Sequence, residues 1–117
     1  MAETLAADRL SRQLQKIRAK GRTALIGYLV AGDPDLTTTE MVIAAVATAG
    51  LDLLELGIPY SDPVADGPTI AAAGQRALAA GTTVEDCLDL VERLHHLVPT
   101  ILFTYFNPVY QFGIERF

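Results

Sequence analysis

Features that are scarce in this sequence exclude several classes of protein. The chain has one cysteine, Cys87, which excludes an internal disulfide and is typical of a reducing compartment. Acidic residues outnumber basic ones, 14 against 9, and the net charge of -5 argues against nucleic acid or an anionic membrane as a partner. The longest apolar run, Ala24 to Ala31, is far shorter than the roughly 20 residues of a membrane-spanning helix.

The amino end also lacks a targeting signal. Met1 to Thr4 supplies neither the basic start nor the apolar centre of a secretory leader. The composition that remains, 50% hydrophobic and 20% charged over 117 residues, is that of a globular protein. We therefore expect a soluble protein of the cytoplasm.

Apolar periodicity and turn residues predict helices that alternate with strands. The expected helices are Leu5 to Lys20, a helix opened by a Thr37–Glu40 capping box and ending at Ala49, Pro68 or Thr69 to Ala80, a helix opened by a Thr82–Glu85 capping box, and a helix starting at Ile114. The expected strands are Thr23 to Val30, Leu51 to Leu56 and Thr100 to Tyr105, with a loop from Phe106 to Gly113.

This order implies parallel strands joined by right-handed crossovers. The pattern alone fits both an open sheet and a closed barrel, since both are built from the same unit. No Gly-x-Gly-x-x-Gly follows the first strand, which weakens a dinucleotide-binding interpretation.

The stretch from Leu51 to Pro68 has the most unusual chemistry. In a strand, Glu55 shares one face with apolar residues, where a carboxylate is costly to bury unless it is paired or protonated. Glycines and prolines then predict a long loop that carries Asp62 and Asp66. A strand end and a following loop that both supply carboxylates are typical of α/β enzyme sites at the carboxyl edge of a sheet.

On the residues alone, simpler interpretations stay open. Glu55 suits a salt-bridging acid, Asp66 before a glycine is ordinary turn chemistry, and Tyr28 suits a core aromatic. We expect no metal at His95 and His96, because neighbouring helical side chains point about 100° apart and rarely share an ion.

A longer pattern carries a family resemblance. The segment Leu54 to Ile70 reads Leu-Glu-Leu-Gly-Ile-Pro-Tyr-Ser-Asp-Pro-Val-Ala-Asp-Gly-Pro-Thr-Ile. It is flanked, in order, by Ala31-Gly32-Asp33-Pro34, Ala80-Gly81-Thr82-Thr83 and Thr104-Tyr105-Phe106-Asn107-Pro108. From about Ile17 onward the chain resembles the front half of the tryptophan synthase α subunit family.

The resemblance implies a (β/α)8 TIM barrel, which takes about 250 residues when complete. Residues 1–117 would then form a partial barrel domain of about three βα units, truncated before strand four. We expect such a fragment alone to be unstable or self-associated and catalytically silent, since its sheet would keep unpaired edges and an uncovered apolar face. The loops after strands seven and eight, which hold the substrate phosphate in such barrels, have no counterpart here.

The resemblance also implies a lyase that cleaves indole-3-glycerol phosphate to indole and glyceraldehyde 3-phosphate in a retro-aldol reaction. Glu55 matches the catalytic glutamate of that family, and Asp66 matches its second acid, which accepts a hydrogen bond from the indole N–H. Tyr28 and Tyr105 match aromatic positions around the indole. No cofactor is expected in this chain, because pyridoxal phosphate belongs to the β subunit.

The partner implied by the resemblance is that β subunit, in an α2β2 heterotetramer. Two segments match the family's contact regions and contain Pro59, Asp62 and Pro63 in the first and Asn107 and Pro108 in the second. Two alternatives remain: a docking fragment that only binds the β subunit, and a stand-alone lyase that releases indole freely.

Overall fold

Helices and strands alternate along the chain in the computed structural model, which describes residues 2–117, with side chains from Asp8 onward. In order they are α1 (Ala2–Ala19), β1 (Ile26–Val30), α2 (Leu36–Ala49), β2 (Leu53–Gly57), α3 (Pro68–Ala79), α4 (Val84–Leu94), β3 (Thr100–Phe103) and α5 (Phe106–Phe112). The predicted order is confirmed up to β3. The strands are shorter than predicted or shifted: β1 begins at Ile26 rather than Thr23, β2 runs from Leu53 to Gly57 rather than from Leu51 to Leu56, and β3 ends at Phe103 rather than Tyr105. Further differences lie at two helix caps and after Tyr105.

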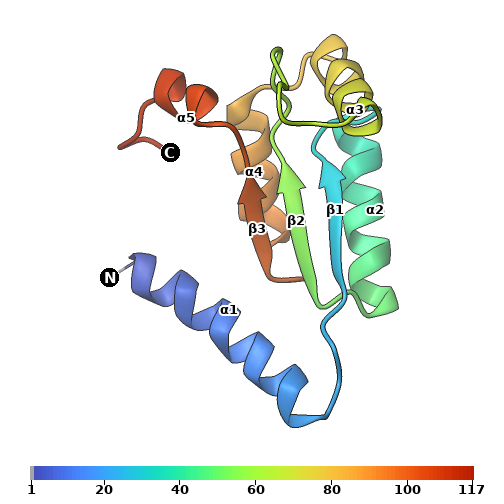
Figure 1. The fold of residues 1–117 in the computed structure, drawn as a ribbon, viewed down its shortest axis with the longest axis vertical. Coiled ribbons are helices and arrows are strands. Elements are labelled where there is room, and N and C mark those ends of the chain that lie inside the picture. Colours follow the sequence, from blue (N-terminus) through green and yellow to red (C-terminus); the bar gives the residue numbers. More distant parts are fainter. Residues whose placement is uncertain (1) are drawn as a thin grey trace.

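The strands form one parallel sheet, as predicted, and their order in it is β1-β2-β3. Helices α2 and α4 lie against one face of it (Figure 1). Because side chains alternate along a strand, Leu54 and Leu56 of β2 both point to this face, where they pack with Ile43 of α2 and Leu90 of α4. All four side chains are at most 2% exposed, so this layer is the hydrophobic core.

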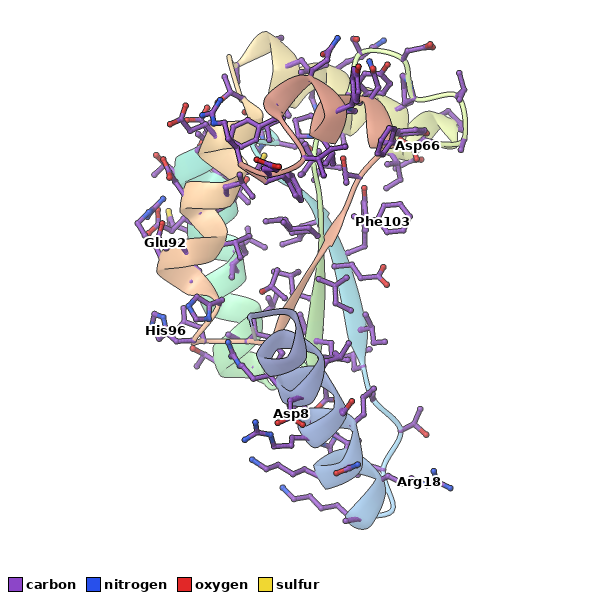
Figure 2. The ribbon with its side chains drawn as sticks, turned by 90° about the vertical axis from the view of Figure 1, so that its left-hand side faces the viewer. Asp8, Arg18, Asp66, Glu92, His96 and Phe103 are labelled. Carbon is purple, nitrogen blue, oxygen red and sulfur yellow. The ribbon has the colours of Figure 1, made fainter. Side chains whose placement is uncertain are left out.

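The opposite face of the sheet carries Leu53, Glu55 and Gly57, the alternate residues of β2. Figure 2 shows Phe103 of β3 projecting from this side, away from the two core helices. Its side chain is 53% exposed, and Ile26 of β1 is 47% exposed. This open face is therefore accessible at Ile26 and Phe103, whereas Leu53 at the amino end of β2 is only 1% exposed and α3 packs on Val30 at the carboxyl end of β1.

Helix α1 crosses the amino-terminal ends of the strands, at the far end of the sheet from α3 and α5 (Figure 1). Ile17 is its buried anchor at 4% exposure. Next to it, the Asp52 carboxylate accepts a hydrogen bond from the Leu25 N–H (2.8 Å) and pairs with Arg22 (3.0 Å). The bonds from Arg22 and then from Leu25 lower the pKa of Asp52.

The predicted capping box at the start of α2 is wrong. The N-cap is Asp35, whose carboxylate accepts the Thr38 N–H at 2.7 Å, and Thr37 already lies within the helix. Glu40 is used differently, in an ion pair with Arg93 of α4 (2.7 Å). Aspartate is a better N-cap than threonine, which explains why the helix begins two residues earlier.

The second capping box exists one residue later than predicted, between Thr83 and Asp86. Thr82 is unavailable as a cap because it is buried at 6% exposure against the turn after β1. A Cβ on Gly32 would lie 1.9 Å from the Thr82 hydroxyl oxygen, so the two residues are in tight contact. Tertiary packing thus moved the helix start by one position.

The predicted loop from Phe106 to Gly113 is wrong, since Phe106–Phe112 forms helix α5. Asn107 and Pro108 read as loop residues, but they fall in the first turn, where a helix has no use for the missing proline N–H. Gly113, at φ 111°, ends the helix. The helix expected from Ile114 is also wrong, because residues 114–116 form only a turn.

No helix within residues 2–117 is both long and apolar enough to cross a membrane.

Candidate active site

The candidate site lies at the carboxyl ends of the strands, where the acidic loop (residues 58–67), α3 and α5 gather (Figure 1). Tyr28 and Glu55 are register partners on β1 and β2, and in a parallel pair such residues project from the same face. That face is the open one, and both side chains are half-buried. The strands therefore present a phenol and a carboxyl side by side.

Gly57 explains how Tyr28 fits over the end of β2. A Cβ at position 57 would lie 2.1 Å from the Tyr28 hydroxyl oxygen and 2.8 Å from Cζ. Any larger residue at position 57 would therefore push the ring away. The ring also meets Phe103 of β3 edge-on, with centroids 5.7 Å apart, so it extends from β1 across the end of β2 to β3.

Burial and nearby negative charges both change the pKa of Tyr28. Burial raises the pKa of its phenol, and the negative charges of Asp66, then Glu55, then the Tyr105 phenol raise it further. Charges act on the phenol in this way only at short range, since water and salt screen distant ones. Tyr28 and Glu55 are therefore neighbours on the sheet, and Asp66 and Tyr105 are carried by the segments that follow β2 and β3 at the same edge.

Asp66 is placed by the backbone of the acidic loop. Its N–H donates to the Pro63 carbonyl at 3.1 Å, which closes a turn, and the side chain is half-buried. The preceding N–H, of Ala65, donates to the Tyr105 hydroxyl at 2.9 Å. Tyr105 thus anchors the loop that carries Asp66, a role for which no local sequence pattern is a signal.

Tyr105 and Tyr60 connect the acidic loop to α5. Their rings lie 5.3 Å apart between centroids. The Asn107 side-chain amide donates to the Tyr60 hydroxyl at 2.9 Å. The two segments predicted to contact a partner are therefore joined to each other.

The residues predicted for the partner interface differ in exposure. Asp62 and Asn107 are exposed and Pro63 is half-buried. Pro59 and Pro108 are buried, and both line a cavity of about 360 Å³ between the acidic loop, the start of α4 and α5. Pro59 and Pro108 therefore lie beneath this surface, whereas Asp62 and Asn107 are exposed on it.

A further ion pair near the site was not predicted. Arg76 of α3 donates two hydrogen bonds to the Asp33 carboxylate, at 2.7 and 3.0 Å. This fork joins the turn after β1 to α3, which begins two residues after Asp66. Asp33 belongs to the Ala-Gly-Asp-Pro segment, so the motif was visible, but its basic partner 43 residues away was not.

The histidine pair lies far from this site, at the end of α4. The rings of His95 and His96 meet edge-on with centroids 6.4 Å apart, and Nδ1 of His95 is bonded to Arg9 at 2.7 Å. Within the described part of the chain, no group of three or more His, Cys, Asp or Glu side chains is placed to hold a metal ion.

The arrangement has a clear chemical capacity. Glu55 on a strand can give and take a proton next to the half-buried ring of Tyr28. Asp66 can hold a carboxylate fixed near the same ring, where it would accept an N–H or stabilise positive charge. Together they suit an aromatic molecule that gains positive charge as it is protonated.

Comparison with known proteins points in one direction. The family model described as tryptophan synthase alpha chain matches residues 14–117. The tryptophan synthase alpha chain of Citrifermentans bemidjiense is 50% identical over 112 residues, which cover 94% of this chain and 42% of the relative. The tryptophan synthase alpha chain of Methanosarcina acetivorans is 48% identical over 110 residues, which cover 94% of this chain and 40% of the relative.

Solved structures agree with these relatives. Tryptophan synthase from M. tuberculosis, in an aminoacrylate-bound form, superposes with a TM-score of 0.88 and 41% identity over 92% of this chain and 44% of that one. The tryptophan synthase alpha subunit from Legionella pneumophila superposes with a TM-score of 0.81 and 38% identity, over 92% of this chain and 42% of that one. The chain spans about two fifths of the length of the relatives it matches, and the α/β fold predicted from the sequence as the amino-terminal part of a (β/α)8 barrel is confirmed. The chain belongs to the tryptophan synthase alpha chain family.

Proposed function

We propose that this chain supplies the proton-transfer residues of a lyase that cleaves indole-3-glycerol phosphate to indole and glyceraldehyde 3-phosphate. The observation that carries the proposal is the pairing of Tyr28 and Glu55 on the open face, with Asp66 close enough for its charge to act on the same phenol. An enzyme for this reaction needs a proton carrier beside a flat aromatic ring, and this arrangement provides one.

The proposed reaction needs one carboxyl to act twice. Protonated Glu55 gives its proton to C3 of the indole, and the ring becomes a positively charged indoleninium. The Glu55 carboxylate then takes the proton of the hydroxyl on the adjacent carbon. The carbon–carbon bond breaks, its electrons restore the neutral indole, and the hydroxyl carbon becomes the aldehyde of glyceraldehyde 3-phosphate.

Asp66 would stabilise the charged intermediate. Its carboxylate accepts the indole N–H, and the bond strengthens as positive charge develops on that nitrogen. The Tyr105 hydroxyl holds the adjacent backbone at Ala65, so Asp66 is positioned before the substrate arrives. Tyr28 would contact the ring of the indole from the side of β1.

The test uses a chimera in which this chain replaces the matching part of the Citrifermentans bemidjiense relative. We expect this chimera to release indole, and Glu55→Gln to lower kcat by about 100-fold or more with the circular dichroism spectrum unchanged. Glu85→Gln, the same change at an exposed position of α4, serves as the matched control and should leave kcat unaltered. Retained turnover in Glu55→Gln would remove Glu55 from the mechanism.

A second candidate function is docking to the β subunit of tryptophan synthase. Asp62 and Asn107 are exposed, and apolar side chains surround them on the acidic loop and α5: Val64 is 80% exposed, Phe106 68% and Tyr110 65%. An exposed apolar patch with polar groups at its edge suits a protein interface.

Docking is tested by adding purified β subunit to the chimera and following its activation. We expect Asp62→Ala to reduce activation, whereas Asp89→Ala, at an exposed position of α4, should not. Activation that is equal in all variants would count against the docking role of Asp62. Indole release that is the same with and without the β subunit would favour a stand-alone lyase.

We also propose that the protein acts in the cytoplasm. The support is its single thiol, Cys87, which is fully buried rather than placed to form a disulfide. Cell fractionation with an antibody against the chain would test this location.

A further inference from the structure

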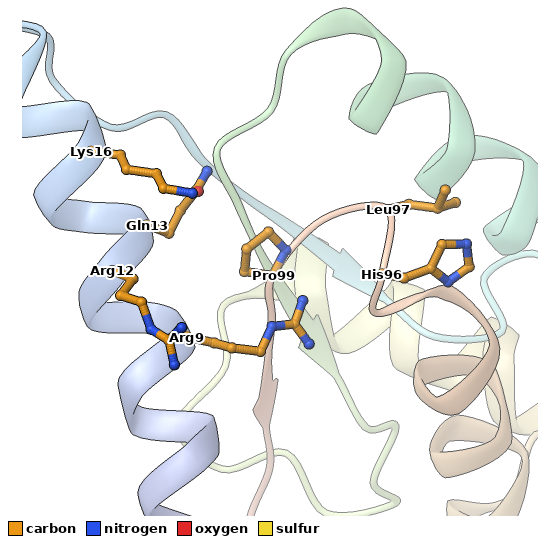
Figure 3. A pocket seen from close by; sticks show the side chains of 7 residues that line it. All are labelled: Arg9, Arg12, Gln13, Lys16, His96, Leu97 and Pro99. Carbon is orange, nitrogen blue, oxygen red and sulfur yellow. The ribbon is translucent and has the colours of Figure 1, made fainter.

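A basic cavity lies at the end of the sheet opposite the candidate active site. It has a volume of about 370 Å³ and opens between α1 and the connection from α4 to β3 (Figure 3). Arg9, Arg12, Gln13 and Lys16 line it from α1, with His96 and Pro99 on the other side. Nothing in the proposed lyase reaction uses these residues.

The cavity concentrates positive charge in an acidic chain. Arg9, Arg12 and Lys16 are spaced so that they share one face of α1, whereas the whole chain carries a net charge of -5. Asp8 offsets only one of these charges, through its 2.6 Å ion pair with Arg12. Among residues 8–117, no salt bridge involves Arg9 or Lys16.

Both guanidinium groups are already held in place. Arg9 is bonded through Nη1 to Nδ1 of His95 at 2.7 Å, and its Nη2 donates to the His95 carbonyl at 3.1 Å. Arg12 donates to the Asp8 carboxylate and carbonyl. Each guanidinium has further N–H donors, so both can bind another acceptor with little additional loss of side-chain freedom.

We propose that this basic cavity binds a small phosphate compound that carries at least two negative charges. Residues 9 to 16 span about 10 Å along a helix, too far for a single carboxylate but suited to two linked phosphate groups. The donors come from α1 and from His96 across the gap, and the oxygens of a phosphate accept from several directions. The volume is that of a small-molecule site.

The experiment is a calorimetric titration of the chimera with inorganic pyrophosphate at low salt. We expect saturable binding that weakens as salt rises, because ions screen the charges. Lys16→Gln and Arg12→Gln should each weaken binding by about tenfold. Arg18→Gln removes the same charge from the same helix outside the cavity, and should change binding by less than about twofold.

Three results would overturn the proposal. The first is no heat of binding for pyrophosphate in the folded chimera. The second is an Arg18→Gln variant weakened as much as Lys16→Gln, which would show a general charge effect rather than a site. The third is succinate binding as tightly as pyrophosphate, which would exclude a phosphate preference. Glutamine is a good helix former, so these variants keep α1 intact, and circular dichroism checks this.

Discussion

The substitution Gly57→Ala tests how closely Tyr28 packs over the end of β2, because it displaces the ring and leaves the side chains of Glu55 and Asp66 unchanged. The added methyl would lie 2.1 Å from the Tyr28 hydroxyl oxygen, whereas ordinary contact begins near 3.4 Å, so the ring must move by more than 1 Å. Overpacking of this kind costs about 1–3 kcal/mol of folding free energy. In the chimera, a shift of about 1 Å in a group beside the substrate should lower kcat by up to about 100-fold.

A double-mutant cycle with Tyr28→Phe identifies the contact responsible. Removing the hydroxyl deletes the 2.1 Å contact but leaves the one at 2.8 Å to Cζ, so Gly57→Ala should cost less in the Tyr28→Phe background without becoming neutral. Unfolding in urea, followed by circular dichroism, should give a coupling free energy of about 0.5–3 kcal/mol. An equal cost of Gly57→Ala in both backgrounds would refute this account of the glycine.

Other predictions concern the titrating groups and the loop anchor. Asp66→Asn and Glu55→Gln should each lower the pKa of Tyr28, Asp66→Asn by more, although burial keeps that pKa above its ordinary value. The Cζ signal in the NMR spectrum of labelled tyrosine measures the pKa. An unchanged pKa in both variants would show that the two carboxylates do not lie near the phenol. Burial raises the pKa of Cys87 from 9.0 to about 12, so the free energy of unfolding should fall as pH rises from 9 toward 12, when the unfolded thiol ionises first. At neutral pH the thiol should react with a disulfide reagent only as the chain unfolds, and fast labelling of the folded chain would contradict its burial. Tyr105→Phe keeps the ring but removes the hydrogen bond to the acidic loop, which should lower the free energy of unfolding by about 1 kcal/mol. Hydrogen exchange of the Ala65 amide should become faster in this variant, and unchanged exchange would contradict the role of Tyr105 as an anchor.

The strands and their order could be predicted from the sequence because their signals are strong and local. β2 has an apolar run bounded by glycines, and its parallel pairing follows from the helices on either side. The same periodicity placed Glu55 on the face opposite Leu54 and Leu56. The face of the sheet on which each of these β2 residues lies was therefore predicted correctly, because it depends only on the alternation of side chains along a strand.

The start of α4 could not be predicted, because a tertiary contact decides it. Thr82 and Thr83 are equivalent as local caps, and only the contact of Thr82 with Gly32 leaves capping to Thr83. The same limit applies to the site. Neither the hydrogen bond from Ala65 to Tyr105 nor the pair of Asp33 and Arg76 has a local signal, since each joins residues 40 or more apart in sequence.

The two ends of the sheet differ in charge, and this constrains how the proposed substrate would lie. Glu55 lies near the carboxyl end of β2, and Asp62 and Asp66 lie on the loop that follows it. A phosphate dianion about 4 Å from one carboxylate would meet a repulsion of several kcal/mol at an effective dielectric constant of about 20. The uncharged indole ring must therefore face Glu55 and Asp66, with the phosphate directed away from β2. This orientation places C3 and the N–H of the indole beside the carboxyls that the proposed reaction uses, so the same repulsion that excludes the phosphate also orients the ring.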